Sequence, residues 1–113
     1  YNADPVPAKM GTFSQYQYPH TLERYVECAN FCGVSGKNDQ ETLDLFIEKI
    51  EALKERVGIK KTIADYGVSE EDFLATLDEM SEMAFDDQCT GANPRYPLIS
   101  EIKEMYLKAY YGK

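Results

Sequence analysis

The fold class is decided by residues 38–58, which read NDQETLDLFIEKIEALKERVG. Charged side chains alternate there with apolar ones at helical spacing. The apolar positions are Leu43, Phe46, Ile47, Ile50, Leu53 and Val57. This spacing predicts an amphipathic helix, because residues three and four apart lie on one helical face. Asn38 with Glu41 resembles a capping box at its start, and Gly58 is placed to end it.

Two further helices flank this stretch. One is predicted over Thr21–Cys32 and ends before Gly33. Another is predicted to begin where Ser69 and Asp72 resemble a capping box. The apolar face of this later helix consists of Phe73, Leu74, Leu77, Met80, Met83 and Ala84. The intervening residues 59–66 predict a loop with one short helical turn, closed by Gly67.

A fourth helix is predicted near the end of the chain. Pro97 suits its first turn, where a missing N–H costs nothing, and Gly112 ends it. Its apolar face consists of Leu98, Ile99, Ile102, Met105, Tyr106, Ala109 and Tyr110. No stretch alternates polar and apolar residues for long enough to predict a strand. The sequence therefore predicts an all-α fold of four main helices.

Residues 1–19 predict an extended, irregular lead-in. Pro disfavours a helix or a central strand, because it lacks an N–H and has a fixed φ. Three of the five Pro lie in this segment, at Pro5, Pro7 and Pro19. We expect its aromatic residues to attach it to a core. These are Phe13, Tyr16 and Tyr18.

Composition excludes some classes of partner. The net charge of −8 would repel nucleic acid and anionic membrane surfaces. No apolar run approaches the roughly 20 residues that a membrane span needs. Three Cys without a visible secretory signal favour reduced thiols and a cytoplasmic location. The chain begins at Tyr1 without Met, so we expect it to be processed or a piece of something longer.

Metal binding is a weak interpretation of the remaining motifs. Cys28 and Cys32 are four apart and could supply half of a zinc site, but the chain holds no second pair and only one histidine, His20. We favour small buried thiols for both Cys, and a helix-entry role for His20. The paired acids Glu70-Glu71 are interpreted as favourable charge at a helix start, and Asp86-Asp87 likewise carries no expected chemistry.

Residues 85–97, FDDQCTGANPRYP, form the most varied polar stretch after the first third of the chain. One interpretation is a rigid turn, because Gly91 permits positive φ and Pro94 restricts Asn93. The other is the lip of a pocket formed around Cys89. The residues alone leave both open.

The same stretch, extended through Leu98-Ile99, resembles the C-terminal end of bifunctional aldehyde-alcohol dehydrogenases, whose second half belongs to the iron-containing alcohol dehydrogenase family. The segments Tyr1-Asn2-Ala3, Phe13-Ser14-Gln15-Tyr16, Gly67-Val68 and Asp72-Phe73-Leu74-Ala75 are also similar to that family. The resemblance covers essentially residues 1–113. It implies the C-terminal helical subdomain of a dehydroquinate synthase-like fold.

The resemblance also implies an activity for a parent polypeptide. Such a parent reduces acetaldehyde to ethanol with NADH in fermentation, at an iron (Fe²⁺) that polarises the carbonyl. The family's one Asp and three His ligands, and most of its NAD site, would lie upstream of Tyr1. We therefore expect no catalytic residue, metal or cofactor in this chain, and no activity when it is isolated. The expected partners are the rest of the parent and other copies in an oligomer or filament.

What the resemblance assigns to this chain is part of a pocket wall. The Cys of the family's Cys-Thr-Gly segment approaches the substrate and nicotinamide, which implies a substrate-pocket position for Cys89. Thr90, Gly91 and Asn93 would shape that wall, and Arg95 would position the loop.

A different class of function is a stand-alone helical module for protein interaction or self-assembly. It is suggested by apolar residues that fall off the predicted stripes, among them Phe31, Leu45 and Leu107.

Overall fold

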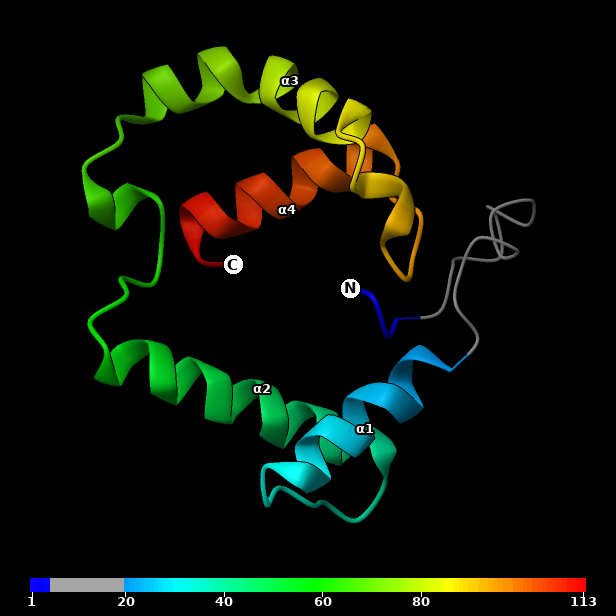
Figure 1. Cartoon of the computed structure of the whole chain (residues 1–113). Coiled ribbons are helices and arrows are strands. Elements are labelled where there is room, and N and C mark those ends of the chain that lie inside the picture. The colour runs from blue at the N-terminus through cyan, green and yellow to red at the C-terminus, as the bar shows by residue number, and fades with distance from the viewer. Residues whose placement is uncertain (5–19) are drawn as a thin grey trace. The chain divides into compact units, whose positions relative to one another are not determined.

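The computed structural model describes residues 1–4 and 20–113. The chain divides into two compact units, Tyr1–Val57 and Gly58–Lys113. All the regular elements in the described ranges are helices (Figure 1). The first unit contains α1 (Thr21–Phe31) and α2 (Asp39–Arg56). The second contains η3 (Ala64–Tyr66), α3 (Glu70–Asp86), η4 (Thr90–Ala92) and α4 (Ile99–Tyr111).

The first unit is a helix pair joined by a tight loop. Gly33 ends α1 with a φ of 77°, in the left-handed region that favours Gly. The side chain of Asn38 accepts a hydrogen bond from the Glu41 backbone N–H and caps α2. The Glu41 carboxylate accepts from the Lys37 backbone N–H. It thus reaches one residue beyond the Asn38 N–H that a standard capping box would use.

The apolar stripe of α2 is buried only near its start. Leu43 is buried, but the exposed fraction is 42% for Ile50 and 63% for Val57, and Ile47 and Leu53 are also exposed. Figure 1 shows the reason, since α1 crosses α2 near the N-terminal end of α2. The 11 residues of α1 are too few to cover a helix of 18. The amphipathic pattern is therefore present, but within the first unit most of its apolar face stays uncovered.

The structure can be compared with two further expectations for the first unit, those for the lead-in and for the thiols. The Asn2 side chain donates to the Tyr25 hydroxyl of α1 over 3.2 Å, whereas residues 5–19, with Phe13, Tyr16 and Tyr18, lie outside the described residues. The prediction that Cys28 and Cys32 are buried is wrong, because both thiols are exposed. They lie at the end of α1 beyond the face that packs on α2, whose buried centre is Ala29.

The second unit is held by a small core between α3 and α4. Phe73, Leu77 and Tyr110 form its buried centre. The rings of Phe73 and Tyr110 stack with centroids 4.2 Å apart, and the Tyr110 hydroxyl donates to the Val68 carbonyl over 2.8 Å. The start of α3 therefore lies beside the end of α4, so the two helices are antiparallel.

Two details of α4 differ from the sequence prediction. The helix begins at Ile99 with Leu98 as its N-cap, so Pro97 lies before the first turn. The Glu101 carboxylate accepts the Leu98 N–H over 2.9 Å and sets this later start. Leu107 was expected off the apolar stripe, but it packs against the core cluster. Phe31 does lie off its stripe, with 94% of its surface exposed.

The start of α3 and the end of α4 are also joined at the surface. The Tyr111 hydroxyl donates to the Glu70 carboxylate. That hydrogen bond raises the pKa of Tyr111 above its ordinary 10.0, because ionised phenol could no longer donate to the carboxylate. Lys103 and Asp78 form an exposed ion pair between the same helices.

Candidate functional site

The first half of the loop after α3 is folded back on the end of that helix. The Asp87 carboxylate accepts the Cys89 N–H over 2.8 Å, and the Asp87 carbonyl accepts the Thr90 N–H over 3.0 Å. This is an Asx-type turn, which Asp forms readily because its short side chain reaches its own backbone two residues on. The Thr90 hydroxyl donates to the carbonyl of Ala84 inside α3. Residues 87–92 are therefore held as one turn around η4.

The second half of the loop is joined to the start of α4. The Arg95 guanidinium lies 2.6 Å from the Glu101 carboxylate, and 8% and 15% of their respective side chains are exposed. The Asn93 side-chain amide donates to the Arg95 carbonyl. The ring of Tyr96 meets that of Phe85 edge to face, with centroids 5.9 Å apart. The loop is thus fixed at both ends by side chains of its own sequence.

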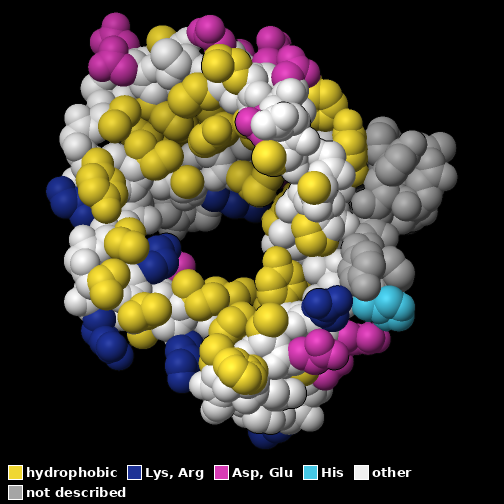
Figure 2. Space-filling view, viewed as in Figure 1, with side chains coloured by type: hydrophobic (Ala, Val, Ile, Leu, Met, Phe, Trp, Pro, Cys, Tyr) yellow, Lys and Arg dark blue, Asp and Glu magenta, His cyan; other side chains and the backbone are white. Residues whose placement is uncertain are grey.

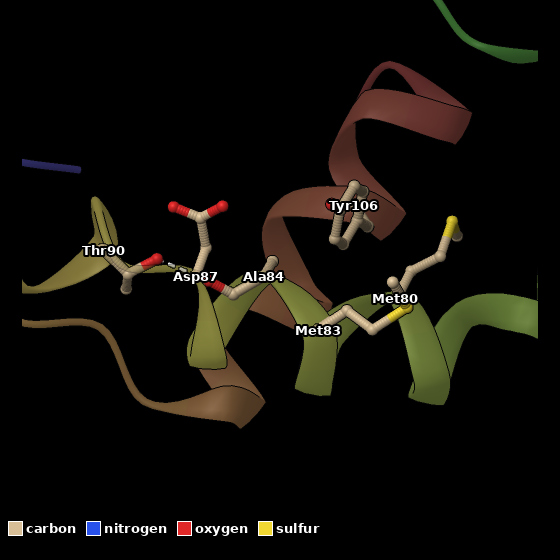
Figure 3. Close-up of a pocket in the computed structure, with 6 residues that line it drawn as sticks. All are labelled: Met80, Met83, Ala84, Asp87, Thr90 and Tyr106. Carbon is tan, nitrogen blue, oxygen red and sulfur yellow. Dashed lines mark hydrogen bonds between the residues drawn. The ribbon is translucent and has the colours of Figure 1, made fainter.

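A cleft of about 500 Å³ opens beside this loop (Figure 3). Its lining consists of Met80, Met83, Ala84, Asp87, Thr90 and Tyr106. Figure 3 shows the Met side chains and Ala84 on α3, Tyr106 on α4, and the Asp87 carboxylate beside Thr90 at the loop end. Asp87 is the charged residue of the lining. The arrangement suits an apolar molecule with a polar end.

A second cleft of about 280 Å³ adjoins the first. The two share Met80 and Tyr106. The other residues that line the second cleft are Ile63, Val68, Asp72, Phe73 and Thr76. In the space-filling view, hydrophobic side chains gather over the α3–α4 pair (Figure 2). The lining of the smaller cleft is mostly apolar, whereas Asp87 and Thr90 give the larger cleft a polar side at the loop.

Only some of the predicted site residues lie at the cleft. Thr90 lines the larger cleft, whereas Cys89, Gly91 and Asn93 are not part of its lining. The Cys89 thiol is exposed, and the Asn93 side chain is engaged by the Arg95 carbonyl. Arg95 contacts Glu101, as a residue that positions the loop would.

Five residues that line the larger cleft were not predicted as site residues, namely Met80, Met83, Ala84, Asp87 and Tyr106. Asp87 was set aside with the acidic pairs, although an Asp two residues before a loop Cys is a recognisable Asx-turn signal. The sequence offers no such signal for Met80, Met83 or Tyr106, because apolar residues at helical spacing predict a core equally well.

Among residues 1–4 and 20–113, no three His, Cys, Asp or Glu side chains gather closely enough to hold a metal ion. The described residues therefore do not fit an iron site by themselves. Their side chains can bind a small molecule, shape the wall of its pocket and exclude water from it.

Comparison with known proteins decides the family. The family described as "Fe-containing alcohol dehydrogenase family, C-terminal" matches residues 6–110. The chain belongs to the iron-containing alcohol dehydrogenase family. The predicted resemblance is confirmed, and so is the all-α fold of the family's C-terminal domain.

The relatives of this iron-containing alcohol dehydrogenase chain are much longer than the chain itself. It is 50% identical over 115 residues to the bifunctional aldehyde-alcohol dehydrogenase of Escherichia coli K12, covering 100% of this chain and 13% of that protein. It is 49% identical over 110 residues to the aldehyde-alcohol dehydrogenase of Clostridium acetobutylicum, covering 97% and 13%. An alcohol dehydrogenase of Thermococcus barophilus is 42% identical over 92 residues, covering 81% and 22%.

The family match assigns this chain to the C-terminal part of the iron-containing alcohol dehydrogenase family, and the chain spans about an eighth of the length of the aldehyde-alcohol dehydrogenases that it matches. No cofactor site is apparent in the described residues. None of the helices in those residues has the length and apolar character needed to cross a membrane.

Proposed function

We propose that this chain is the C-terminal helical part of an NAD- and iron-dependent enzyme that reduces acetaldehyde to ethanol in the cytoplasm. In that proposal the chain supplies scaffold and one wall of the substrate pocket. The observation that carries it is the fixed loop at residues 87–97 beside a cleft lined by both apolar and polar residues, in a chain half identical to a bifunctional aldehyde-alcohol dehydrogenase. Acetaldehyde has an apolar methyl group and a polar carbonyl, which matches a wall of that character.

Catalysis is expected to require the longer polypeptide. The purified 113-residue chain should bind no stoichiometric iron and should not oxidise NADH with acetaldehyde, because the described residues offer no metal site. The full-length polypeptide that carries this sequence should do both. Metal analysis and NADH absorbance measure the two quantities on matched samples. Stoichiometric iron with turnover in the isolated chain would overturn the proposal.

The loop itself is tested at Cys89. A Cys89→Leu substitution in the full-length polypeptide should raise KM for the aldehyde while leaving the melting temperature nearly unchanged, because an exposed thiol contributes little to packing. A Cys28→Leu substitution is the matched control, since that thiol is also exposed but lies on α1. Unchanged kinetics with a large loss of stability would make Cys89 a packing residue.

A second candidate is a stand-alone helical module that binds other proteins or itself. The uncovered stripe on α2 and the exposed Phe31 favour it, because large apolar side chains in water are typical of contact surfaces. In the first proposal the same stripe would face the rest of the parent polypeptide, or another copy in an oligomer or filament. Light scattering after size-exclusion chromatography would show whether the chain alone self-associates.

A further inference from the structure

We infer that Glu101 is a positioning residue for the pocket. Acting through Arg95, it holds residues 87–97 so that Asp87 and Thr90 stay on the wall of the cleft. The inference rests on the proposed function and assigns to one carboxylate the placement of that wall.

Glu101 is suited to this task because its two oxygens bind two different segments. Oε1 accepts from Nη2 of Arg95 over 2.6 Å, and Oε2 accepts the Leu98 backbone N–H over 2.9 Å. The first bond holds the second half of the loop, and the second holds Leu98, the N-cap of α4. One side chain therefore ties the loop to a rigid helix.

The charge of the pair makes this tie strong. Arg95 is buried, and the Glu101 side chain is 15% exposed, so water screens the pair less than it screens an exposed one. Removing the carboxylate charge would weaken the pairing of a buried guanidinium, and a buried charge that is less well paired is destabilised relative to one in water. We therefore expect the Arg95 side chain to move, and not merely to lose one hydrogen bond while it stays in place.

A movement of Arg95 would reach the cleft through the hydrogen bonds within the loop. The Arg95 carbonyl holds the Asn93 side-chain amide, and the Asn93 N–H in turn donates to the Thr90 carbonyl over 3.1 Å. Thr90 lines the cleft. The contacts run from Glu101 to the pocket wall without a gap, although Glu101 itself does not line the cleft.

The test uses Glu101→Gln in the full-length polypeptide, because Gln keeps the shape and removes the charge. We expect KM for acetaldehyde to rise about tenfold, with kcat and iron content nearly unchanged, because misplacement of a binding wall weakens substrate binding. Arg95→Gln should behave alike. The double variant should raise KM no more than either single change does, since both changes remove the same interaction.

Asp78→Asn is the matched control. It removes an ion pair between the same two helices, but Asp78 and Lys103 are exposed and lie outside the loop. We expect its KM to equal that of the unchanged enzyme. An equal effect of the Asp78 and Glu101 variants, or additive effects of Arg95→Gln and Glu101→Gln, would overturn the inference.

A readout independent of activity comes from amide hydrogen exchange in the loop. The N–H groups of Thr90, Ala92 and Asn93 are hydrogen-bonded within the turn. They should exchange faster in Glu101→Gln and at the unchanged rate in Asp78→Asn. Unchanged exchange in Glu101→Gln would show that the carboxylate only caps α4.

The two proposals fail in distinguishable ways. If neither Cys89→Leu nor Thr90→Val changes KM, the loop is no pocket wall and the proposed function fails. If those variants raise KM while Glu101→Gln and Arg95→Gln do not, only the positioning role of Glu101 is refuted.

Discussion

Between the two described glycines of the first unit, Gly33 and Gly36, it is Gly36 whose backbone lies close to another segment. A Cβ added there would lie 2.8 Å from the backbone nitrogen of Thr42 and 2.9 Å from the Glu41 Cβ. The Gly36 N–H donates to the Thr42 hydroxyl over 2.9 Å, which draws the loop onto the start of α2. The local sequence gives no sign of this close approach, because the requirement for Gly arises from how the loop returns to the helix.

We therefore expect Gly36→Ala to destabilise the chain. The clash is with backbone atoms that cannot rotate away, and overpacking of this kind costs about 1–3 kcal/mol. Urea unfolding followed by circular dichroism measures the change in free energy of unfolding. Gly91→Ala is the control, because its Cβ would meet no atom within 4 Å. Equal stability of Gly36→Ala and the unchanged chain would refute the close approach.

At the scale of elements, the sequence predicted most where the signal is local. Asn38 and Ser69 cap α2 and α3 as expected, each accepting a backbone N–H three residues on. Gly58, Gly67 and Gly112 have positive φ at the ends of their elements. The start of α4 was misplaced by two residues, because it depends on a side chain, Glu101, that also serves the loop.

The uncovered part of α2 leads to a prediction about that helix. Ile50→Gln should change the free energy of unfolding of the isolated chain by less than about 0.5 kcal/mol, because Ile50 is already exposed. In the full-length polypeptide the same change should lower the melting temperature, if the stripe is covered there. Denaturant and thermal unfolding of both forms measure the two effects.

Leu43→Ala is the control on the same helix. Leu43 is buried within the first unit, so its truncation should cost about 2–5 kcal/mol in both forms. If Ile50→Gln destabilised the isolated chain as much as Leu43→Ala does, the stripe would be buried in solution by another copy. No effect in the full-length polypeptide would favour the stand-alone module.

At the scale of the whole chain, the helices and the family were predictable and the distribution of burial was not. Periodicity shows that Ile47, Ile50 and Leu53 share a face, but not what covers it, and these three side chains are exposed in the described part of the first unit. The same limit applies to the site. The loop motif identified Thr90 and the family, whereas Met80, Met83 and Tyr106 line the cleft only because α3 and α4 are antiparallel.

The loop at 87–97 also has a consequence for how the protein is made. Four side-chain hydrogen bonds described above, from Asp87–Cys89 to Arg95–Glu101, join residues no more than six positions apart. Contacts of such low sequence separation form rapidly, since loops of about 10 residues close in roughly 10–100 ns. We expect these local contacts to form as soon as residues 84–101 are available.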